Sequence, residues 1–296
     1  MKHIPVMLEQ VTAGVVCNSD GHYIDGTFGG GGHSRYLLEH FPNIKLTAID
    51  RDPDAISRAE KLKIEFSGRF EFLNMPFSQI DVLKDKKFDG IFFDFGISSL
   101  QLDDEERGFS FRFHSSLDMR MNPNEGISAY EFLQTANWEQ LVEAVRDFGE
   151  ERHWKKIISL ILQHRGSESL KYSDTFAELI SRNVAKTGRI HPATKTFQGL
   201  RIAINRELDE IRQVLPKAFQ LLTHGGRLAA ISFHSLEDRI VKQFFNQCAG
   251  KSDQMSTERR PACAKILTKK PMIPDLDEIQ NNPRSRSAKL RILEKI

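Results

Sequence analysis

The first hundred residues alternate between short apolar runs and longer stretches in which apolar side chains recur every three or four positions. The short runs have the length and composition of buried strands, and the longer stretches have the spacing of amphipathic helices. This alternation predicts an open α/β sheet with parallel strands. The runs end in polar residues or turns, at the sheet edge where α/β proteins bind ligands. The expected strands are Tyr23–Asp25, Lys45–Asp50, Phe70–Leu73 and Phe88–Asp94.

A long helical segment interrupts this pattern after the fourth run. A connection within a sheet normally needs far fewer residues. We therefore expect an inserted all-helical domain over residues 105–205 and a discontinuous sheet domain formed by residues 1–104 and 206–296. One long helix should run from Pro192 past Leu215 and bend at Pro216. Strand-like runs return at Arg227–Phe233 and Lys289–Leu293.

A glycine-rich turn, Gly29–Gly32, separates the first strand from the first helix. Glycine lets the backbone approach a ligand closely. No register of this turn gives the Gly-x-Gly-x-x-Gly pattern of dinucleotide sites, and Asp25 would place a negative charge where a pyrophosphate lies. A carboxylate there suits a cationic centre, such as the ammonium or sulfonium of S-adenosylmethionine. A glycine turn that binds no ligand is the alternative.

Polar residues at the ends of other strands are further candidates for the site. Asp50 follows Gly32 at about the spacing at which an acid contacts a ribose hydroxyl, and capping of the next helix is the alternative. Asp94 ends the fourth strand beside the glycine turn, and it is the candidate catalytic residue. His234 follows the fifth strand, where it is either part of the site or a hydrogen-bonded structural histidine.

The composition limits the classes of protein to which the chain can belong. The chain has 296 residues, of which 40% are apolar and 28% charged, as in ordinary globular proteins. Its three cysteines are odd in number and widely spaced, which predicts neither a disulfide framework nor a metal site. The sequence shows no signal-peptide pattern and no apolar run of about 18 residues, so we expect a cytoplasmic protein without a membrane span.

Basic residues are clustered although the net charge is only +2. Clusters lie in 182–206, 259–270 and 284–291, and local basic patches suit a polyanion, with a solvated face as the alternative. Phe109, Phe111 and Phe113 alternate with arginines, either as a stacking surface for unpaired bases or as an aromatic plug. The first cluster contains Arg182, Lys186, Arg189, Lys195, Arg201 and Arg206.

Longer motifs resemble those of one family, the bacterial 16S ribosomal RNA cytosine-N4 methyltransferases, which depend on S-adenosylmethionine. The resemblance covers nearly the whole chain, and its motifs are long and specific. They are His3–Val6, Asp25–Gly29, Gly31–Ser34, Ala48–Asp52, Asp94–Ser99, Gln101–Asp103, Glu106–Phe111, Leu117–Met121, His191–Thr194, Ile231–Asp238 and Asn282–Arg286.

The resemblance implies a Rossmann-like class I methyltransferase sheet with an insert that recognises the substrate. It implies methyl transfer to the N4 amine of a cytidine in the decoding region of 16S rRNA, within the small ribosomal subunit. Leu100 stands where the family often has proline, which would leave the loop before Gln101 less rigid. The cofactor contacts implied by position are Gly31, Gly32, His33, Asp50, Phe77, Asp94 and Gln101.

Other functions remain open at this point. A methyltransferase acting on an amine in DNA or protein would share the cofactor half, and so would an RNA assembly factor that binds the cofactor without turnover. A dehydrogenase is disfavoured by the glycine pattern. The sequence also leaves open whether the chain forms a homodimer.

Overall fold

The computed structural model describes residues 5–186, 190–251 and 261–296, which fold into two compact units. The sheet unit consists of Met1–Gly96 and Leu208–Ile296, and the helical unit of Ile97–Glu207. The helical unit includes a short helix, α4 (Ser99–Asp103), which the sequence pattern assigned to the sheet domain.

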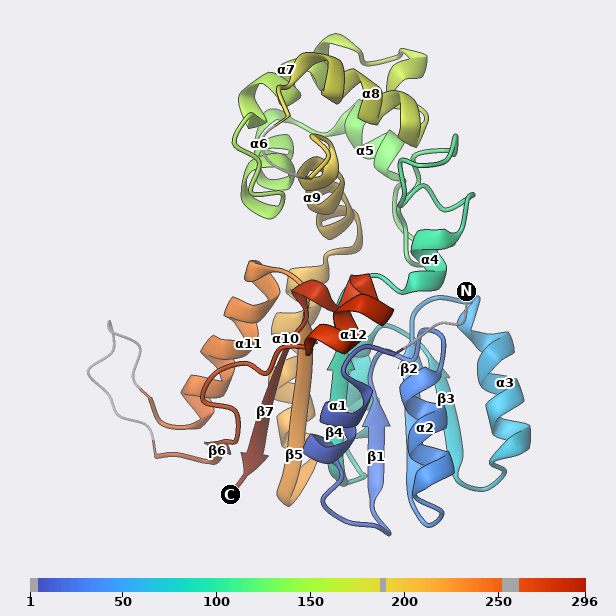
Figure 1. The fold of residues 1–296 in the computed structure, drawn as a ribbon, viewed down its shortest axis with the longest axis vertical. Helices are drawn as coiled ribbons and strands as arrows, with labels where there is room; N and C mark the ends of the chain where they lie inside the picture. Colours follow the sequence, from blue (N-terminus) through green and yellow to red (C-terminus); the bar gives the residue numbers. More distant parts are fainter. Residues whose placement is uncertain (1–4, 187–189, 252–260) are drawn as a thin grey trace. The chain divides into compact units, whose positions relative to one another are not determined.

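Seven strands of the described chain form one mixed sheet in the order β3-β2-β1-β4-β5-β7-β6 (Figure 1). The first five strands pair in parallel, and β7 is antiparallel to both β5 and β6. The predicted Rossmann-like sheet is therefore confirmed. The strand order reverses between β1 and β4, and ligands of such sheets bind beyond the carboxyl ends of the strands at this switch point. The strands are β1 (His22–Asp25), β2 (Lys45–Asp50), β3 (Phe70–Asn74), β4 (Phe88–Asp94), β5 (Leu222–Ser232), β6 (Ala264–Ile266) and β7 (Lys289–Lys295).

Helices cover both faces of this sheet. On one face, α1 (Leu8–Val15), α2 (Gly32–His40) and α3 (Ala55–Glu65) contribute to a core that includes Phe92. On the other, α10 (Glu207–Leu221) and α11 (Ser235–Cys248) contribute to a core that includes Phe93. Neighbouring residues of one strand thus enter opposite cores, which explains the unbroken apolar runs in the sequence. The shorter helices are η1 (Phe77–Leu83), α12 (Leu276–Asn281) and η4 (Pro283–Ser287).

The helical unit has a core of its own, formed by the apolar stripes of its helices. Helix α9 (Thr194–Asn205) approaches η2 (Glu143–Phe148) so closely that a Cβ on Gly199 would lie 2.0 Å from the carbonyl oxygen of Ala144. Only glycine fits at this contact. The remaining helices are α5 (Ala129–Thr135), α6 (Trp138–Val142), η2 (Glu143–Phe148), α7 (Trp154–Gln163), η3 (Glu168–Leu170), α8 (Ser173–Asn183) and α9 (Thr194–Asn205).

The prediction of a single long helix after Pro192 is wrong. The chain forms α9 and then α10, separated at Arg206, whose φ of 52° is left-handed and incompatible with a continuous helix. Pro216 lies within α10, so the break occurs ten residues before the proline (216 − 206). Apolar spacing continues across the break, which is why periodicity alone did not detect it.

Asn205, the last residue of α9, connects this helix to the loop around residue 120. Its side-chain amide donates to the carbonyl oxygens of Met119 (2.8 Å) and Arg201 (2.9 Å), and its oxygen accepts the amide of Met121 (2.7 Å). Met119 has a φ of 62°, which is strained for a residue with a side chain. The buried amide of Asn205 therefore holds a strained loop in place.

No helix in the described part of the chain is long and apolar enough to cross a membrane.

We expect Asn205→Ala to lower the free energy of unfolding by about 1–3 kcal/mol, because it leaves buried backbone groups of the loop without partners. Chemical denaturation would measure the loss. Asn124→Ala, at an exposed position of the same segment, serves as the control and should change stability by less than about 0.5 kcal/mol. Equal effects of the two substitutions would show that the Asn205 hydrogen bonds are not important for stability.

Candidate functional site

The glycine turn joins β1 to α2 at the switch point of the sheet. Gly29 and Gly31 have φ of 51° and 74°, in the left-handed region that favours glycine. Packing imposes a second requirement, because a Cβ on Gly31 would lie 2.7 Å from the ring of Phe28 and one on Gly32 would lie 2.3 Å from Pro5. Backbone conformation and close packing therefore both require glycine in this turn.

Asp25 stabilises the glycine turn through hydrogen bonds to its carboxylate. Its carboxylate is 1% exposed and accepts the hydroxyl of Ser34 (2.6 Å) and the amide of Thr27 (3.1 Å). Burial, together with the nearby charge of Asp50, raises the pKa of Asp25 to about 7, although the hydrogen bonds from Ser34 and Thr27 act in the opposite direction. Because both oxygens already have donors within the turn, Asp25 stabilises the turn, which differs from the ligand-facing position inferred from the sequence.

Asp50 connects the end of β2 to the same turn. One of its oxygens accepts the amide of Gly29 at 2.6 Å, and the other accepts the amide of Asp52 at 2.9 Å. Burial raises the pKa of its carboxyl group. The residue at the N-cap position of α3 is Asp54, so the helix-capping alternative for Asp50 is wrong. Asp50 remains beside the glycine turn as an acid of the candidate site.

Asp94 has one buried carboxylate oxygen without a hydrogen-bond donor among the described residues. Its backbone amide donates to the hydroxyl of Thr27 (2.7 Å), which places it beside the turn. Its Oδ1 is buried and has no hydrogen-bond partner among the described residues. Burial, followed by the negative charges of Asp25, Glu237 and Glu278, holds the pKa of Asp94 well above its usual value. A buried acceptor without a donor is costly, so it marks where a ligand donor would bind.

Two further candidates flank these acids within the sheet unit. His33, 7% exposed at the start of α2, has its Nε2 3.0 Å from the carbonyl oxygen of Val6. Phe77 begins η1 after β3, and its ring centroid lies 5.7 Å from that of Phe93 and 5.8 Å from that of Phe95. His33 is therefore tied to the N-terminal segment, whereas Phe77 belongs to an aromatic cluster beside the end of β4.

Gln101 belongs to the helical unit. It lies in α4, where its side-chain oxygen accepts the amide of Ser98 (3.1 Å) and its own amide donates to the Ser98 hydroxyl (3.2 Å). This reciprocal pair caps the helix. The capping pair fixes the local backbone although Leu100 replaces the proline of the family pattern. The structure thus gathers the glycine turn, Asp50, Phe77 and Asp94 in one unit and leaves Gln101 in the other.

Sequence reasoning missed two carboxylates near Asp94. Glu237 follows His234 by three residues, a capping pattern that could have drawn attention to it. Glu278 accepts the amide of Met7 (2.7 Å), but nothing in the sequence signals a contact between residues so far apart. The described residues contain no group of three or more acidic, histidine or cysteine side chains able to hold a metal ion.

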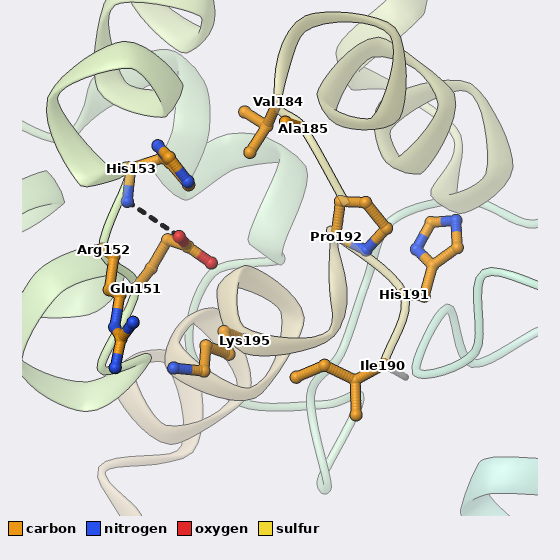
Figure 2. A pocket seen from close by; sticks show the side chains of 9 residues that line it. All are labelled: Glu151, Arg152, His153, Val184, Ala185, Ile190, His191, Pro192 and Lys195. Atoms are coloured by element: carbon orange, nitrogen blue, oxygen red, sulfur yellow. Dashed lines mark hydrogen bonds between the residues drawn. The ribbon is translucent and has the colours of Figure 1, made fainter. Parts of the chain in front are cut away.

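The helical unit contains a pocket of about 350 Å³, lined on one side by Arg152, Lys195 and the carboxylate of Glu151 and on the other mainly by apolar residues. The ammonium of Lys195 donates to the carbonyl oxygen of Glu150 (2.8 Å), and Glu151 accepts the amide of His153 (2.8 Å). A cationic wall attracts phosphate, and an apolar wall accommodates the face of a base. Figure 2 shows Glu151, Arg152, His153 and Lys195 on one side, opposite Val184, Ala185, Ile190, His191 and Pro192.

Part of the basic cluster of residues 182–206 is already compensated by ion pairs. Arg201 forms a two-bond ion pair with Glu207 (2.8 and 2.9 Å) and is only 15% exposed, so its charge is already compensated. Arg182 pairs with Glu178 at the surface. Lys186 and Arg206 are exposed. Arg189, Arg259 and Arg260 lie outside the described residues, as do His3 and Ile4 of the first motif.

The aromatic residues after α4 form a plug. Phe109 is buried in the core of the helical unit. The ring of Phe111 stacks on His191 with centroids 4.5 Å apart and meets Phe197 edge-on at 5.1 Å. The guanidinium of Arg107 donates to backbone carbonyl oxygens. These rings and this arginine therefore stabilise the loop, which favours the plug over a stacking surface for bases.

Comparisons with known proteins match this chain over its full length. The MraW methylase family model matches residues 1–296. The ribosomal RNA small subunit methyltransferase H of Caldicellulosiruptor bescii is 43% identical over 313 residues, which covers 100% of this chain and 99% of that protein. The protein of the same name from Fusobacterium nucleatum is 43% identical over 306 residues, which covers 99% of this chain and 97% of that protein.

Asp25 should make the stability of the sheet unit depend on pH. Its pKa rises from 3.8 to about 7 on folding, so the native chain keeps a proton that the unfolded chain loses between these values. The stabilisation is therefore complete below pH 3.8 and is lost as pH rises towards 7, by on the order of 4 kcal/mol for this group alone.

Asp25→Asn removes this titration, while its amide can still accept from Thr27 and donate to Ser34. Chemical denaturation of both proteins at pH 4.5 and pH 7.5 would measure the effect. We expect the wild type to lose stability relative to the variant as the pH rises. A difference that is the same at both pH values would contradict the raised pKa.

Proposed function

The chain belongs to the MraW methylase family, and on this premise we propose that it transfers a methyl group from S-adenosylmethionine to the N4 amine of a cytidine in 16S rRNA. The full-length relatives, named as methyltransferases of small-subunit ribosomal RNA, support this substrate class. Among the structural observations, the buried Oδ1 of Asp94 carries most weight, because it is an unfilled acceptor at the switch point of the sheet.

The residues present fit the cofactor. S-adenosylmethionine supplies a methyl group already activated by a sulfonium centre. We propose that the turn formed by Gly31, Gly32 and His33 holds the methionine part, that Asp50 binds the ribose and that Phe77 contacts the adenine. Asp94 completes the contacts within the sheet unit, and a contact of Gln101 stays an expectation from the family resemblance. The closely packed glycine turn and the acids around it support a ligand that carries positive charge.

The chemistry requires positioning more than a strong base. Cytosine N4 is a weak nucleophile because its lone pair is delocalised into the ring, so the amine must be held in line with the methyl group. Such alignment can contribute about 7–11 kcal/mol. Asp94 is the candidate acceptor for an N–H of the amine, which favours the positive charge that develops there. The target base must be unstacked to reach the methyl group.

The helical unit is the proposed RNA-binding part of the enzyme. Its pocket has a cationic wall that contains Arg152 and Lys195, and Lys186 is exposed in the segment that lines the other side. The strand-end acids lie in the sheet unit. We therefore propose separate roles, with the methyl donor held by the sheet unit and the RNA by the helical unit.

One experiment separates this function from its alternatives. The protein is incubated with small ribosomal subunits that lack the modification and with methyl-labelled cofactor, and the RNA is digested to nucleosides. Labelled N4-methylcytidine supports the proposal. Label in another nucleoside, in protein or in added DNA would assign a different amine, and cofactor binding without label would indicate an assembly factor.

Asp50→Ala should weaken cofactor binding by about 1–3 kcal/mol, the range for a lost hydrogen bond to a charged group. The substitution also removes the acceptor for the amide of Gly29, so the glycine turn should lose order at the same time. Calorimetry would measure the affinity, with Asp54→Ala at the exposed start of α3 as the charge-matched control. Equal affinities for the Asp50 variant and the control would remove Asp50 from the site.

Replacing Lys186 and Lys195 together by alanine should weaken RNA binding and leave cofactor affinity unchanged. Each lost phosphate contact on a single strand reduces the slope of log affinity against log salt by about 0.7, so the pair should reduce it by about 1.4. Lys61→Ala with Lys84→Ala, two exposed lysines of the sheet unit, is the control. An affinity loss at an unchanged slope would show that the two lysines act through shape rather than charge.

A further inference from the structure

His234 follows β5 and occupies the N-cap position of α11. Its side chain is only 9% exposed, and both ring nitrogens are buried without a hydrogen-bond partner among the described residues. A structural histidine in such a position has its nitrogens bonded, because an unsatisfied buried polar group lowers stability. The structure therefore disfavours the hydrogen-bonded structural histidine that the sequence left open, and it favours a place in the site.

The pairing of β4 with β5 brings His234 to the same sheet edge as Asp94. The parallel register pairs Asp94 with Ile231, three residues before His234 (234 − 231). The chain segments stay adjacent beyond this pair, because the amide of Phe95 donates to the carbonyl oxygen of Ile231 at 3.0 Å. With Oδ1 of Asp94, the ends of two neighbouring strands thus carry three buried atoms that have no partner in the described chain. Ligands of such sheets bind at this edge.

Glu237 lies beside the imidazole in the first turn of α11. Its side chain is fully buried, and its Oε2 accepts the backbone amides of Phe233 (2.7 Å) and His234 (3.3 Å). Its Oε1 lies 3.0 Å from Nε2 of His234. The loop after β4 packs against this pair, since a Cβ on Gly96 would lie 4.0 Å from the same Oε1. The pair of His234 and Glu237 therefore adjoins the loop that follows Asp94.

A carboxylate beside Nε2 favours the tautomer of His234 that carries its proton on this nitrogen. Nδ1 then has a free lone pair that can accept a proton, and the carboxylate of Glu237 stabilises the imidazolium that results. A histidine oriented by a carboxylate in this way is suited to act as a general base. Nδ1 of His234 is available for this role, because no donor of the described chain bonds to it.

We propose that His234 is the general base of the methyl transfer: its Nδ1 takes the proton that leaves the target amine, while Asp94 accepts the hydrogen bond of the remaining N–H. This inference rests on the proposed function and assigns a residue to the proton that the reaction releases. An imidazole is a mild base, and it suffices because the methylated amine is acidic.

The proposed step balances in atoms and charge. The amine nitrogen forms a bond to the methyl carbon, and the methyl–sulfur bond breaks with its electron pair remaining on sulfur. One N–H bond of the amine breaks, its electron pair stays on nitrogen, and its proton passes to Nδ1 of His234. One positive charge thus moves from the donor to the imidazolium, which lies beside Glu237 and later returns the proton to solvent.

Charged groups around His234 determine the pH at which it can act. Asp238 forms a two-bond ion pair with Arg291 (2.7 and 3.1 Å) and lies 3.8 Å from Lys289, so its charge is compensated. Glu237 is the carboxylate beside the imidazole, and its charge favours the protonated ring. The charged groups on the elements at this edge include Glu237 and Asp238 on α11, Asp94 on β4, Glu278 on α12, and Lys289 and Arg291 on β7.

The pH dependence of methyl transfer tests this assignment. Small ribosomal subunits that lack the modification are mixed with excess enzyme and saturating labelled cofactor, and the rate of a single turnover is measured between about pH 5 and pH 9. The wild-type rate should fall about tenfold per pH unit on the acidic side, where the imidazole is protonated. His234→Gln should lower the rate by about 10²–10⁴-fold and remove this acidic limb, with cofactor affinity unchanged in calorimetry.

Further variants make the readout specific to proton transfer. Added imidazole should restore part of the activity of His234→Ala, and the restored rate should follow the neutral fraction of the added imidazole. Glu237→Gln keeps an oxygen for the amides of Phe233 and His234 but removes the charge, so the acidic limb should move to lower pH. His224→Gln, at an exposed position of β5, is the control and should change neither the rate nor the limb.

An acidic limb that persists in His234→Gln, or a His234→Ala variant in which imidazole restores no activity, would overturn the proposal. Loss of cofactor binding in both variants would assign His234 a structural role instead. A limb that disappears in Asp94→Asn but persists in His234→Gln would assign the proton to Asp94. If the wild type itself forms no labelled N4-methylcytidine, the proposed function fails, and the assay separates that result from a failure at His234.

Discussion

The site depends on how two strand-end carboxylates share the hydrogen-bond donors of one glycine turn. Asp25 takes the Thr27 amide and Asp50 takes the Gly29 amide, so the turn is anchored to both strands. The hydroxyl of Thr27 in turn accepts the backbone amide of Asp94. Oδ1 of Asp94, beside the turn, is buried and has no hydrogen-bond partner among the described residues.

This arrangement lowers the stability of the folded protein when no ligand is bound. Burial and like charges raise the pKa values of Asp25, Asp50 and Asp94. A cation that binds there relieves the repulsion between the carboxylates. The same cation gains no comparable stabilisation in water away from the protein. An edge of this kind favours a positively charged ligand, because parallel strands end at one edge of the sheet and carry their acids there.

Much of the sheet and of the glycine turn could be predicted from the sequence, because strands and turns are set by local patterns of residues. The parallel strands, the glycine turn and the acids at strand ends were predicted correctly from periodicity and spacing. The direction of each side chain was not predictable. Spacing places Asp25 at the end of β1 but does not reveal that Ser34 occupies its second oxygen. Nor does it reveal the helix break at Arg206, because apolar spacing continues across it.

Contacts between distant parts of the chain could not be predicted either, because local sequence patterns do not show which distant residues meet. The pair of Arg201 with Glu207 removes a charge that looked available for RNA, and the bond from Met7 to Glu278 brings an acid near Asp94 across nearly the whole chain. The family resemblance supplied the remaining site residues, which are Gly31, Gly32, His33, Phe77 and Gln101. Their roles, like those of Asp50 and Asp94, stay predictions.

The most direct test of the account is the ionisation state of Asp94, observed by NMR through the chemical shift of its carboxyl carbon in protein labelled with ¹³C at aspartate. Asp94→Asn identifies the signal. The account predicts that Asp94 of the free protein titrates at a higher pH than an ordinary aspartate does, and that added S-adenosylmethionine moves this titration to lower pH. An Asp94 that titrates like an ordinary aspartate in the free protein, or whose titration the added cofactor leaves unchanged, would contradict it.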